Sequence, residues 1–194
     1  LYDQARGLLR QRQERVGRIT AGPELEDSLP DHVARSLAGA YDAINGGFGQ
    51  EPKFPNGPIL QYLVHLARTT GEAFYRSMLI KSLDSMSCGP LYDAEEGGFF
   101  RNTGNADWTD PQREKLLEDN VILAQVYLDA YSILDREDYR RVASQSIDYI
   151  MTSLFDEAIP GFRGSQGAHS DYFNLPASSR MEHDRPAVDP SCYC

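Results

Sequence analysis

The chain has 194 residues, 41% of them hydrophobic and 25% charged, which is an ordinary globular composition and enough length to bury one sizeable core. Its formal net charge of -10 disfavours a nucleic-acid or anionic-membrane partner, because the average surface would repel either of them. No apolar run approaches the roughly 20 residues that a membrane helix needs, so we expect a soluble protein of cytoplasmic type without a membrane partner.

The first predicted element is a helix over residues 2–17, followed by a loop over residues 20–30 and a partner helix over residues 31–44. Together they make a first hairpin region at about 1–45. The chain opens at Leu1 without a Met and stops without a terminating helix, so we expect it to be a piece of a longer protein.

A second hairpin is predicted over residues 57–87, where apolar residues recur at helical spacing on both sides of a break at residues 69–71. A third is predicted over residues 111–153, with Pro111 in the first turn of its first helix. Residues 155–194 are expected to form a C-terminal loop. Because the periodicity is helical in every hairpin, the sequence predicts an all-α fold.

One motif occurs three times, at residues 41–48, 92–99 and 155–162: an aromatic residue, Asp, three variable residues, Gly or Pro, Gly and Phe. Its Asp residues lie 51 and 63 residues apart, which leaves room for two helices and a loop in each repeat. Gly lets the chain reverse sharply after a helix. Consecutive α-hairpins with similar loops at one end build a toroid or solenoid, so we expect a single domain over residues 1–194 with these loops on one rim.

The three motif Asp side chains have two explanations. Each could accept backbone N–H groups of its own loop in an Asx turn, which is a purely structural role. Alternatively, carboxylates gathered on one rim with aromatic side chains offer what sugar chemistry needs, namely an acid, a base or nucleophile, and flat faces on which sugar rings stack.

On the second explanation, the rim residues divide into two groups. The acid/base candidates are Asp93, Glu96, Asp107 and Glu114. The substrate-binding candidates are Lys53, Phe54, Phe100, Arg101, Trp108 and Asp119. Trp108 has an alternative role as a plug packed against the next helix. Asn120 lies within an apolar stripe and would need a buried hydrogen-bond partner.

No metal site or cofactor is predicted. The three cysteines, at positions 88, 192 and 194, lack the spacing of a zinc site or a redox pair, and we expect free thiols in a reducing compartment. The four histidines are scattered without a metal-ligand pattern.

The motifs resemble a known family. The segments that carry the resemblance are Gly46–Gly49, Pro52–Pro55, Gly97–Arg101, Trp108, Pro111, Glu114–Lys115, Leu117, Asp119–Asn120 and Tyr127. They are similar, over roughly residues 30 to 190, to the helical portion of the thioredoxin-domain-containing proteins of the spermatogenesis-associated type. The resemblance implies about half of an (α/α)6 toroid like those of six-hairpin glycosidases and N-acylglucosamine 2-epimerases. It also implies a thioredoxin-like domain upstream in the parent protein.

The sequence departs from the family at three places. Gln112 and Arg113 stand where the family usually has His-Phe, Glu118 stands where a Tyr is expected, and residues 167–171 replace an acidic loop. If the replaced His is catalytic in the family, the resemblance implies an inactive or altered member.

Two functional hypotheses follow. The first is an enzyme-like toroid that binds or processes a carbohydrate at the rim, with an epimerase- or glycosidase-like activity if it is an enzyme. The second is a non-catalytic interaction scaffold that accompanies the thioredoxin-like domain. The resemblance and the rim chemistry leave both open.

Overall fold

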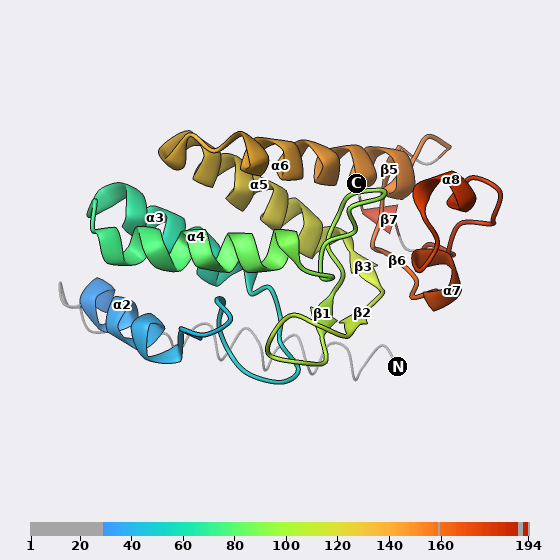
Figure 1. Ribbon diagram of the computed structural model, residues 1–194. Coiled ribbons are helices and arrows are strands. Elements are labelled where there is room, and N and C mark those ends of the chain that lie inside the picture. Colours follow the sequence, from blue (N-terminus) through green and yellow to red (C-terminus); the bar gives the residue numbers. More distant parts are fainter. Residues whose placement is uncertain (1–28, 159, 190–191, 194) are drawn as a thin grey trace, which may run out of the picture. The chain divides into compact units, whose positions relative to one another are not determined.

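The computed structural model describes residues 29–158, 160–189 and 192–193 (Figure 1). The chain divides into two compact units, residues 1–39 and 40–194. Helix α2 (Leu29–Ala40) closes the first unit, while the predicted helix over residues 2–17 lies outside the described residues. Helix α2 ends at Ala40 and not at residue 44 as predicted, because Tyr41 leaves the helix to pair with Phe48.

The second unit contains two of the predicted helical hairpins. The first consists of α3 (Gly57–Thr69) and α4 (Ala73–Cys88), and the second of α5 (Leu117–Leu134) and α6 (Glu137–Tyr149), which continues as the π-helix η1 (Ile150–Leu154). Both turns use a left-handed residue, since Gly71 has φ 69° and Asp135 has φ 54°. Such residues end a helix and reverse the chain.

The first helices of the two hairpins lie side by side and run parallel. Helix α3 packs against α4 and α5, and α5 packs against α6. Gln61 pairs with Gln125 and Arg68 pairs with Ser132 across the α3–α5 interface, both at a sequence separation of 64. A constant separation means parallel helices, so the loops that precede α3 and α5 lie at the same end, as the predicted rim requires.

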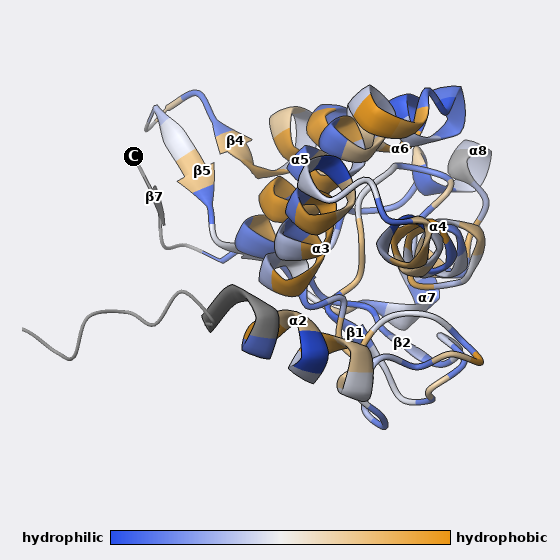
Figure 2. Cartoon of the chain, turned by 90° about the vertical axis from the view of Figure 1, so that its left-hand side faces the viewer, coloured by the Kyte–Doolittle hydropathy of each residue, from blue (hydrophilic) through white to orange (hydrophobic). Residues whose placement is uncertain are grey.

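The core of this unit lies between the four helices. Its fully buried members include Leu60, Leu63, Leu79, Leu83, Leu123, Val126 and Tyr127. In Figure 2, hydrophobic residues, drawn in orange, lie on α3, α5 and α6. The Tyr127 hydroxyl donates to the Leu83 carbonyl oxygen at 2.7 Å, so even the polar atom of this buried ring has a partner.

Short antiparallel strands fix the loops. Strand β1 (Asn102–Thr103) pairs with β2 (Pro111–Gln112), β3 (Lys115–Leu116) pairs with β6 (Ser165–Gln166), and β5 (Gly161–Arg163) lies between β4 (Phe155–Asp156) and β7 (Cys192–Tyr193). The segment predicted as a C-terminal loop also contains α7 (Ser170–Phe173) and α8 (Ala177–Arg180). That prediction was wrong, because β4, β5 and β7 pair with one another within the segment and β6 pairs with the distant β3.

The third hairpin begins at Leu117 and not at residue 111, which corrects a second boundary. Pro111 lies in β2, opposite Thr103, and the preceding Asp110 has φ 59°. Proline is tolerated in a strand at a sheet edge as well as in a first helical turn. Here Pro111 belongs to a strand, because it pairs with β1. Glu114 and Lys115 therefore precede the helix, and Asp119 lies in its first turn.

Candidate functional site

The three repeated loops share one internal geometry. In each, the aromatic residue and the final Phe pair antiparallel: Tyr41 with Phe48, Tyr92 with Phe99 and Phe155 with Phe162. The motif Asp accepts backbone N–H groups from its own loop: Asp42 from Ile44 and Asn45, Asp93 from Glu95, and Asp156 from Ala158. The Asx-turn explanation is thus confirmed for all three.

Each motif Asp also pairs with a cation that follows it in the chain. Lys53 Nζ donates to Asp42 Oδ2 at 2.6 Å, Lys115 Nζ donates to Asp93 Oδ2 at 2.8 Å, and Arg163 pairs with Asp156. Both lysine side chains are completely buried. Burial opposes ionisation of Asp42 and Asp93, but the hydrogen bonds and charges of their partners prevail and hold each pKa below its ordinary value.

The second motif carries a larger ionic network than the first. Arg180 Nη1, from α8, donates to Asp93 Oδ2 at 2.7 Å and contacts Glu96 Oε2 at 3.3 Å. The Tyr172 hydroxyl donates to Glu96 Oε1 at 2.7 Å, and burial together with this carboxylate raises the pKa of Tyr172 to about 12. Asp93 and Arg180 are each 4% exposed, so this network holds the C-terminal segment on the loop.

Four of the predicted site residues are buried in these structural contacts. They are Lys53, Asp93, Phe100 and Trp108. Trp108 is 1% exposed, its Nε1 donates to the Asn45 carbonyl oxygen at 3.0 Å, and Lys53 Nζ lies 4.8 Å from its ring centroid. A stacking platform needs an open ring face, so Trp108 has the alternative role of a plug, and Phe100, 2% exposed, is likewise covered.

Two further acid/base candidates have local roles. Asp107 is exposed, and its Oδ1 accepts from both the backbone N–H and the hydroxyl of Thr109. Those hydrogen bonds hold the pKa of Asp107 below its ordinary value. Glu96 is held by Arg180 and Tyr172. Neither carboxylate is arranged as a free acid or base.

Three of the remaining candidates, Arg101, Glu114 and Asp119, lie at the N-terminal end of α5. Arg101 Nη1 donates to Glu114 Oε2 at 2.9 Å, with the two side chains 48% and 28% exposed, and the backbone of Arg101 donates to the Glu114 carbonyl oxygen. Asp119 lies within the field of Arg101. Phe54, 40% exposed, follows Lys53, whose backbone pairs with Thr103, so its segment runs beside the segment that carries Arg101.

We call Arg101, Glu114, Glu118 and Asp119 the α5 rim. Burial, followed by the charge of Glu118, raises the pKa of Asp119 above its ordinary value, and Arg101 opposes this only in part. A cavity of about 640 Å³ adjoins the rim and is lined by Glu114, Leu116, Leu117, Glu118, Val121, Ile122, Gly164, Ser165 and Asp189. The ion-paired carboxylate of Glu114 therefore lines an open, partly apolar cavity together with that of Glu118, whereas Asp119 follows Glu118 on α5 without being one of the lining residues.

The raised pKa of Asp119 has a consequence for stability. Below the ordinary Asp pKa of 3.8 both the folded and the unfolded chain hold the proton, whereas above the folded pKa the ionised carboxylate costs the folded state free energy. Asp119→Asn is therefore expected to raise the unfolding midpoint at pH 7 and to leave it unchanged near pH 3. Thermal unfolding at both pH values tests this, and a lower midpoint at pH 7 would contradict it.

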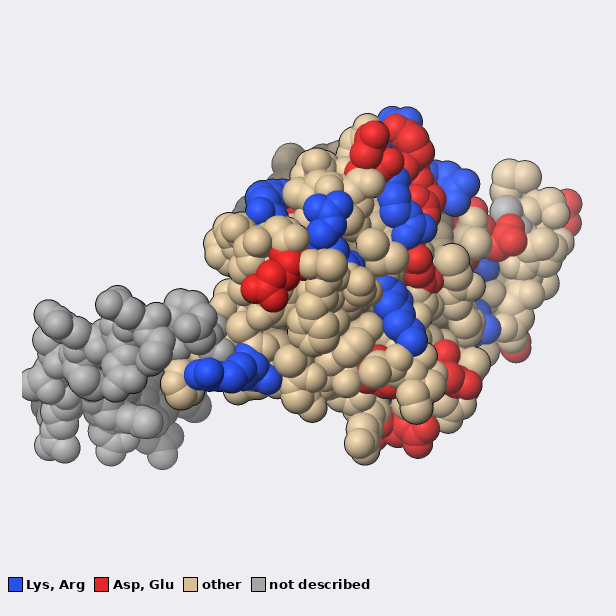
Figure 3. Space-filling view, turned by 60° about the vertical axis from the view of Figure 1, so that its left-hand side comes forward, with Lys and Arg blue, Asp and Glu red and all other residues tan. Residues whose placement is uncertain are grey.

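Neither a metal group nor a membrane helix is found in the part of the chain that the structure describes. Within residues 29–158, 160–189 and 192–193, no three His, Cys, Asp or Glu side chains are placed to hold a metal ion. None of the described helices is both long and apolar enough to cross a membrane. On the face drawn in Figure 3, acidic and basic side chains are interspersed over the described residues.

Parallel first helices with their loops at one end define a segment of an (α/α) toroid, and solved structures share it. A cellobiose 2-epimerase from Spirochaeta thermophila superposes with a TM-score of 0.64 at 19% identity, over 84% of this chain and 41% of that chain. A family 76 glycoside hydrolase (mannosidase) from Bacteroides thetaiotaomicron gives 0.57 at 18% identity, over 73% and 35%. At these identities the likeness shows the fold, and the predicted toroid class is confirmed.

Relatives with known names are similar at the sequence level. Spermatogenesis-associated protein 20 is 31% identical over 153 residues in both mouse and human, which covers 76% of this chain and 19% of each relative. An uncharacterised Caenorhabditis elegans protein is 31% identical over 160 residues, 79% of this chain and 21% of that protein. No protein-family model matches the chain. The predicted resemblance is confirmed, and the chain is homologous to about a fifth of the length of these relatives.

Proposed function

We propose that this toroid segment contributes one wall of a carbohydrate-binding site at the α5 rim. The observation that carries the proposal is a cavity of about 640 Å³ lined by Glu114, which is ion-paired with Arg101, and by Glu118, whose neighbour Asp119 has a raised pKa. A carboxyl group whose pKa is shifted by its surroundings is a candidate acid/base group. Sugar-processing enzymes among the structures of this fold support the choice of ligand.

The roles follow from the contacts. Asp119 is the proton donor, because burial and the charge of Glu118 raise its pKa above the ordinary value. Glu114 is the base, and Arg101 orients it through the ion pair. The apolar wall of Leu117 and Val121 receives the less polar face of a sugar, and Phe54, which is 40% exposed but outside the lining of the cavity, is the candidate stacking surface. The two carboxylates supply the parts that an epimerase or a glycosidase uses.

The second candidate function is a non-catalytic scaffold that accompanies a thioredoxin-like domain in the parent protein. One observation favours it: Asp93, Phe100 and Trp108, which the sequence assigned to a rim site, are all buried in structural contacts. A scaffold predicts that no small sugar binds at the α5 rim, so one experiment separates the two functions.

We expect Glu114→Gln to weaken sugar binding about 10-fold, since a hydrogen bond to a charged group contributes about 1.5 kcal/mol, and Asp119→Asn to weaken it about 5-fold, since a neutral hydrogen bond contributes about 1 kcal/mol. Ligand-observed NMR against monosaccharides, amino sugars and disaccharides measures the change. Glu72→Gln, at the exposed start of α4, is the matched control and should bind like the unaltered protein. Equal binding by both rim variants, or no binding by the folded protein, would favour the scaffold.

A further inference from the structure

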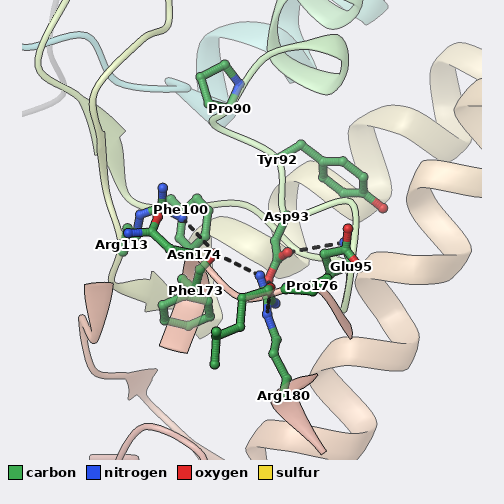
Figure 4. A pocket seen from close by; sticks show the side chains of 11 residues that line it. Pro90, Tyr92, Asp93, Glu95, Phe100, Arg113, Phe173, Asn174, Pro176 and Arg180 are labelled. Atoms are coloured by element: carbon green, nitrogen blue, oxygen red, sulfur yellow. Dashed lines mark hydrogen bonds and ion pairs between the residues drawn. The ribbon is translucent and has the colours of Figure 1, made fainter. Parts of the chain in front are cut away.

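A second cavity, of about 350 Å³, lies beside the buried Asp93 network and shares no lining residue with the cavity at the α5 rim (Figure 4). Its wall combines the loop of the second motif with the segment between α7 and α8. Apolar side chains from Pro90, Leu175 and Pro176 line it, and Arg113, Asn174 and Glu95 add polar groups. Small-molecule sites have this character, with volumes from roughly 300 Å³ upward.

Arg113 is the unusual member of this wall. Its Nη1 donates to the Phe173 carbonyl oxygen at 3.1 Å, and its guanidinium lies 5.4 Å from the Phe100 ring centroid. Within the described residues, no carboxylate lies within ion-pair distance of it, although the chain carries ten more acidic than basic charges. A half-buried guanidinium presents its remaining N–H donors most favourably to an oxyanion.

The other charges at the cavity are already balanced. Asp93 accepts from both Lys115 and Arg180. Arg180 is only 4% exposed, and its guanidinium donates to Asp93, Glu96 and the carbonyl oxygens of Phe173 and Leu175. Arg113 is therefore the cation that a ligand can reach, while Glu95 lies across the cavity from it in Figure 4.

The charge on that opposite side limits the ligand. The Glu95 carboxylate repels negative charge on a ligand, which disfavours a dianion such as a phosphate monoester relative to a monoanion. Glu95 and the Asn174 side chain can instead accept from or donate to hydroxyl groups. A molecule with one carboxylate and several hydroxyls satisfies both sides of the cavity.

We propose that this cavity binds a small hydroxy-carboxylate of the size of one sugar acid, with its carboxylate on Arg113 and its hydroxyls toward Asn174 and Glu95. The site is separate from the α5 rim and does not depend on the proposed function there. A ligand of this cavity must carry a negative charge, whereas a ligand of the α5 rim need not. Binding of charged and of neutral sugars therefore distinguishes the two sites.

Backbone-amide NMR titration tests this with glucuronate as the probe and with glucose, glucose 6-phosphate and acetate as comparison arms. Glucuronate should shift the amides of Asn174 and Leu175, and bind more tightly than the three comparison compounds. Arg113→Met should weaken glucuronate binding about 10-fold or more, because it removes a charge-assisted contact. Arg113→Lys keeps the positive charge but not the planar guanidinium, so its affinity for glucuronate should lie between those of the unaltered protein and Arg113→Met.

Arg76→Met is the matched control, because Arg76 is also half-buried and donates to a carbonyl oxygen, that of Ile133, outside the cavity. It should bind glucuronate like the unaltered protein. The proposal is overturned if the folded protein does not bind glucuronate, if glucose binds as tightly, or if affinity survives Arg113→Met. If Arg113→Met does not fold, affinity undiminished in Arg113→Lys overturns the proposal as well.

Discussion

Replacing Lys115 with Met is expected to lower the free energy of unfolding by about 3 kcal/mol, the low end of the range for a broken buried ion pair. The Lys115 side chain is completely buried, and its Nζ donates to Asp93 Oδ2 and to the Gly97 carbonyl oxygen, both at 2.8 Å. Met fills similar space but leaves both acceptors without this donor. Arg180 still compensates part of the Asp93 charge, which is why the low end applies.

Urea unfolding at pH 7 measures this loss. Because the folded pKa of Asp93 lies below the ordinary 3.8, the stabilisation from its ionised form is present above that value and disappears as the pH falls through the folded pKa. The effect of Lys115→Met should therefore shrink in acid. Adding Asp93→Asn should cost less than the sum of the two single changes, and simple additivity would contradict the buried pair.

An exposed ion pair supplies the control for Lys115. Arg140 contacts Glu137 one turn away on α6, with side-chain exposures of 56% and 65%. Arg140→Met should leave unfolding essentially unchanged, because pairs in contact with water contribute little. If both methionine variants unfold alike, burial does not explain the importance of Lys115.

Gly97→Ala is expected to destabilise the protein by about 2–5 kcal/mol, from left-handed strain of roughly 1–2 kcal/mol together with overpacking of roughly 1–3 kcal/mol. Gly97 has φ 79°, and an added Cβ would lie 2.3 Å from the Gln145 carbonyl oxygen in α6. The Gln145 carbonyl oxygen belongs to the helix backbone, so it cannot move away from the added Cβ as the end of a flexible side chain could. Gly46 meets Lys81 of α4 in the same way, at 2.8 Å, so the first repeat should respond similarly.

Gly49→Ala separates the two causes. Gly49 has φ 86°, but an added Cβ meets nothing within 4 Å, so this variant carries only the strain of roughly 1–2 kcal/mol. Urea unfolding of the two variants side by side measures the difference. Equal losses for Gly49→Ala and Gly97→Ala would mean that the close approach of the loop to α6 contributes nothing.

The hairpins and the repeated loops could be predicted from the sequence because both are local. Helical periodicity located α3 to α6. The repeated Asp predicted an Asx turn, whose hydrogen bonds join the Asp side chain to backbone N–H groups only a few residues later. Asn120, placed in an apolar stripe, was expected to need partners, and it has them in the backbone of Phe99 and Leu116. In each case the signal lies within one element.

The cation partners could not be predicted, because their spacing differs in every repeat. Lys53 follows its Asp by 11 residues and Lys115 by 22, while Arg180 reaches Asp93 from 87 residues away. The same non-local pairing put Pro111 in a strand. Charged residues assigned to chemistry on composition alone therefore included several that hold the loops in place.

The candidate site was predicted in part. Glu114, Arg101, Asp119 and Phe54 remain at an accessible rim, whereas Trp108 and Phe100 are covered. Aromatic residues in polar loops can serve as platforms or as plugs, and the choice depends on what packs over them. The Trp108 ring packs so closely on Gly47 that a Cβ at residue 47 would lie 2.4 Å from the indole, so Trp108 is a plug and not a platform.

Backbone-amide NMR mapping of a bound neutral sugar is the most direct test of the proposed function. The protein is titrated with the sugar that the ligand panel identifies, and the shifted amides are assigned. We predict that the largest shifts fall on Arg101, Glu114 and residues 117–119, and that at one subsaturating sugar concentration they are several-fold smaller in Asp119→Asn. Shifts confined to other segments, or the same shifts in that variant, would contradict a carbohydrate site at the α5 rim.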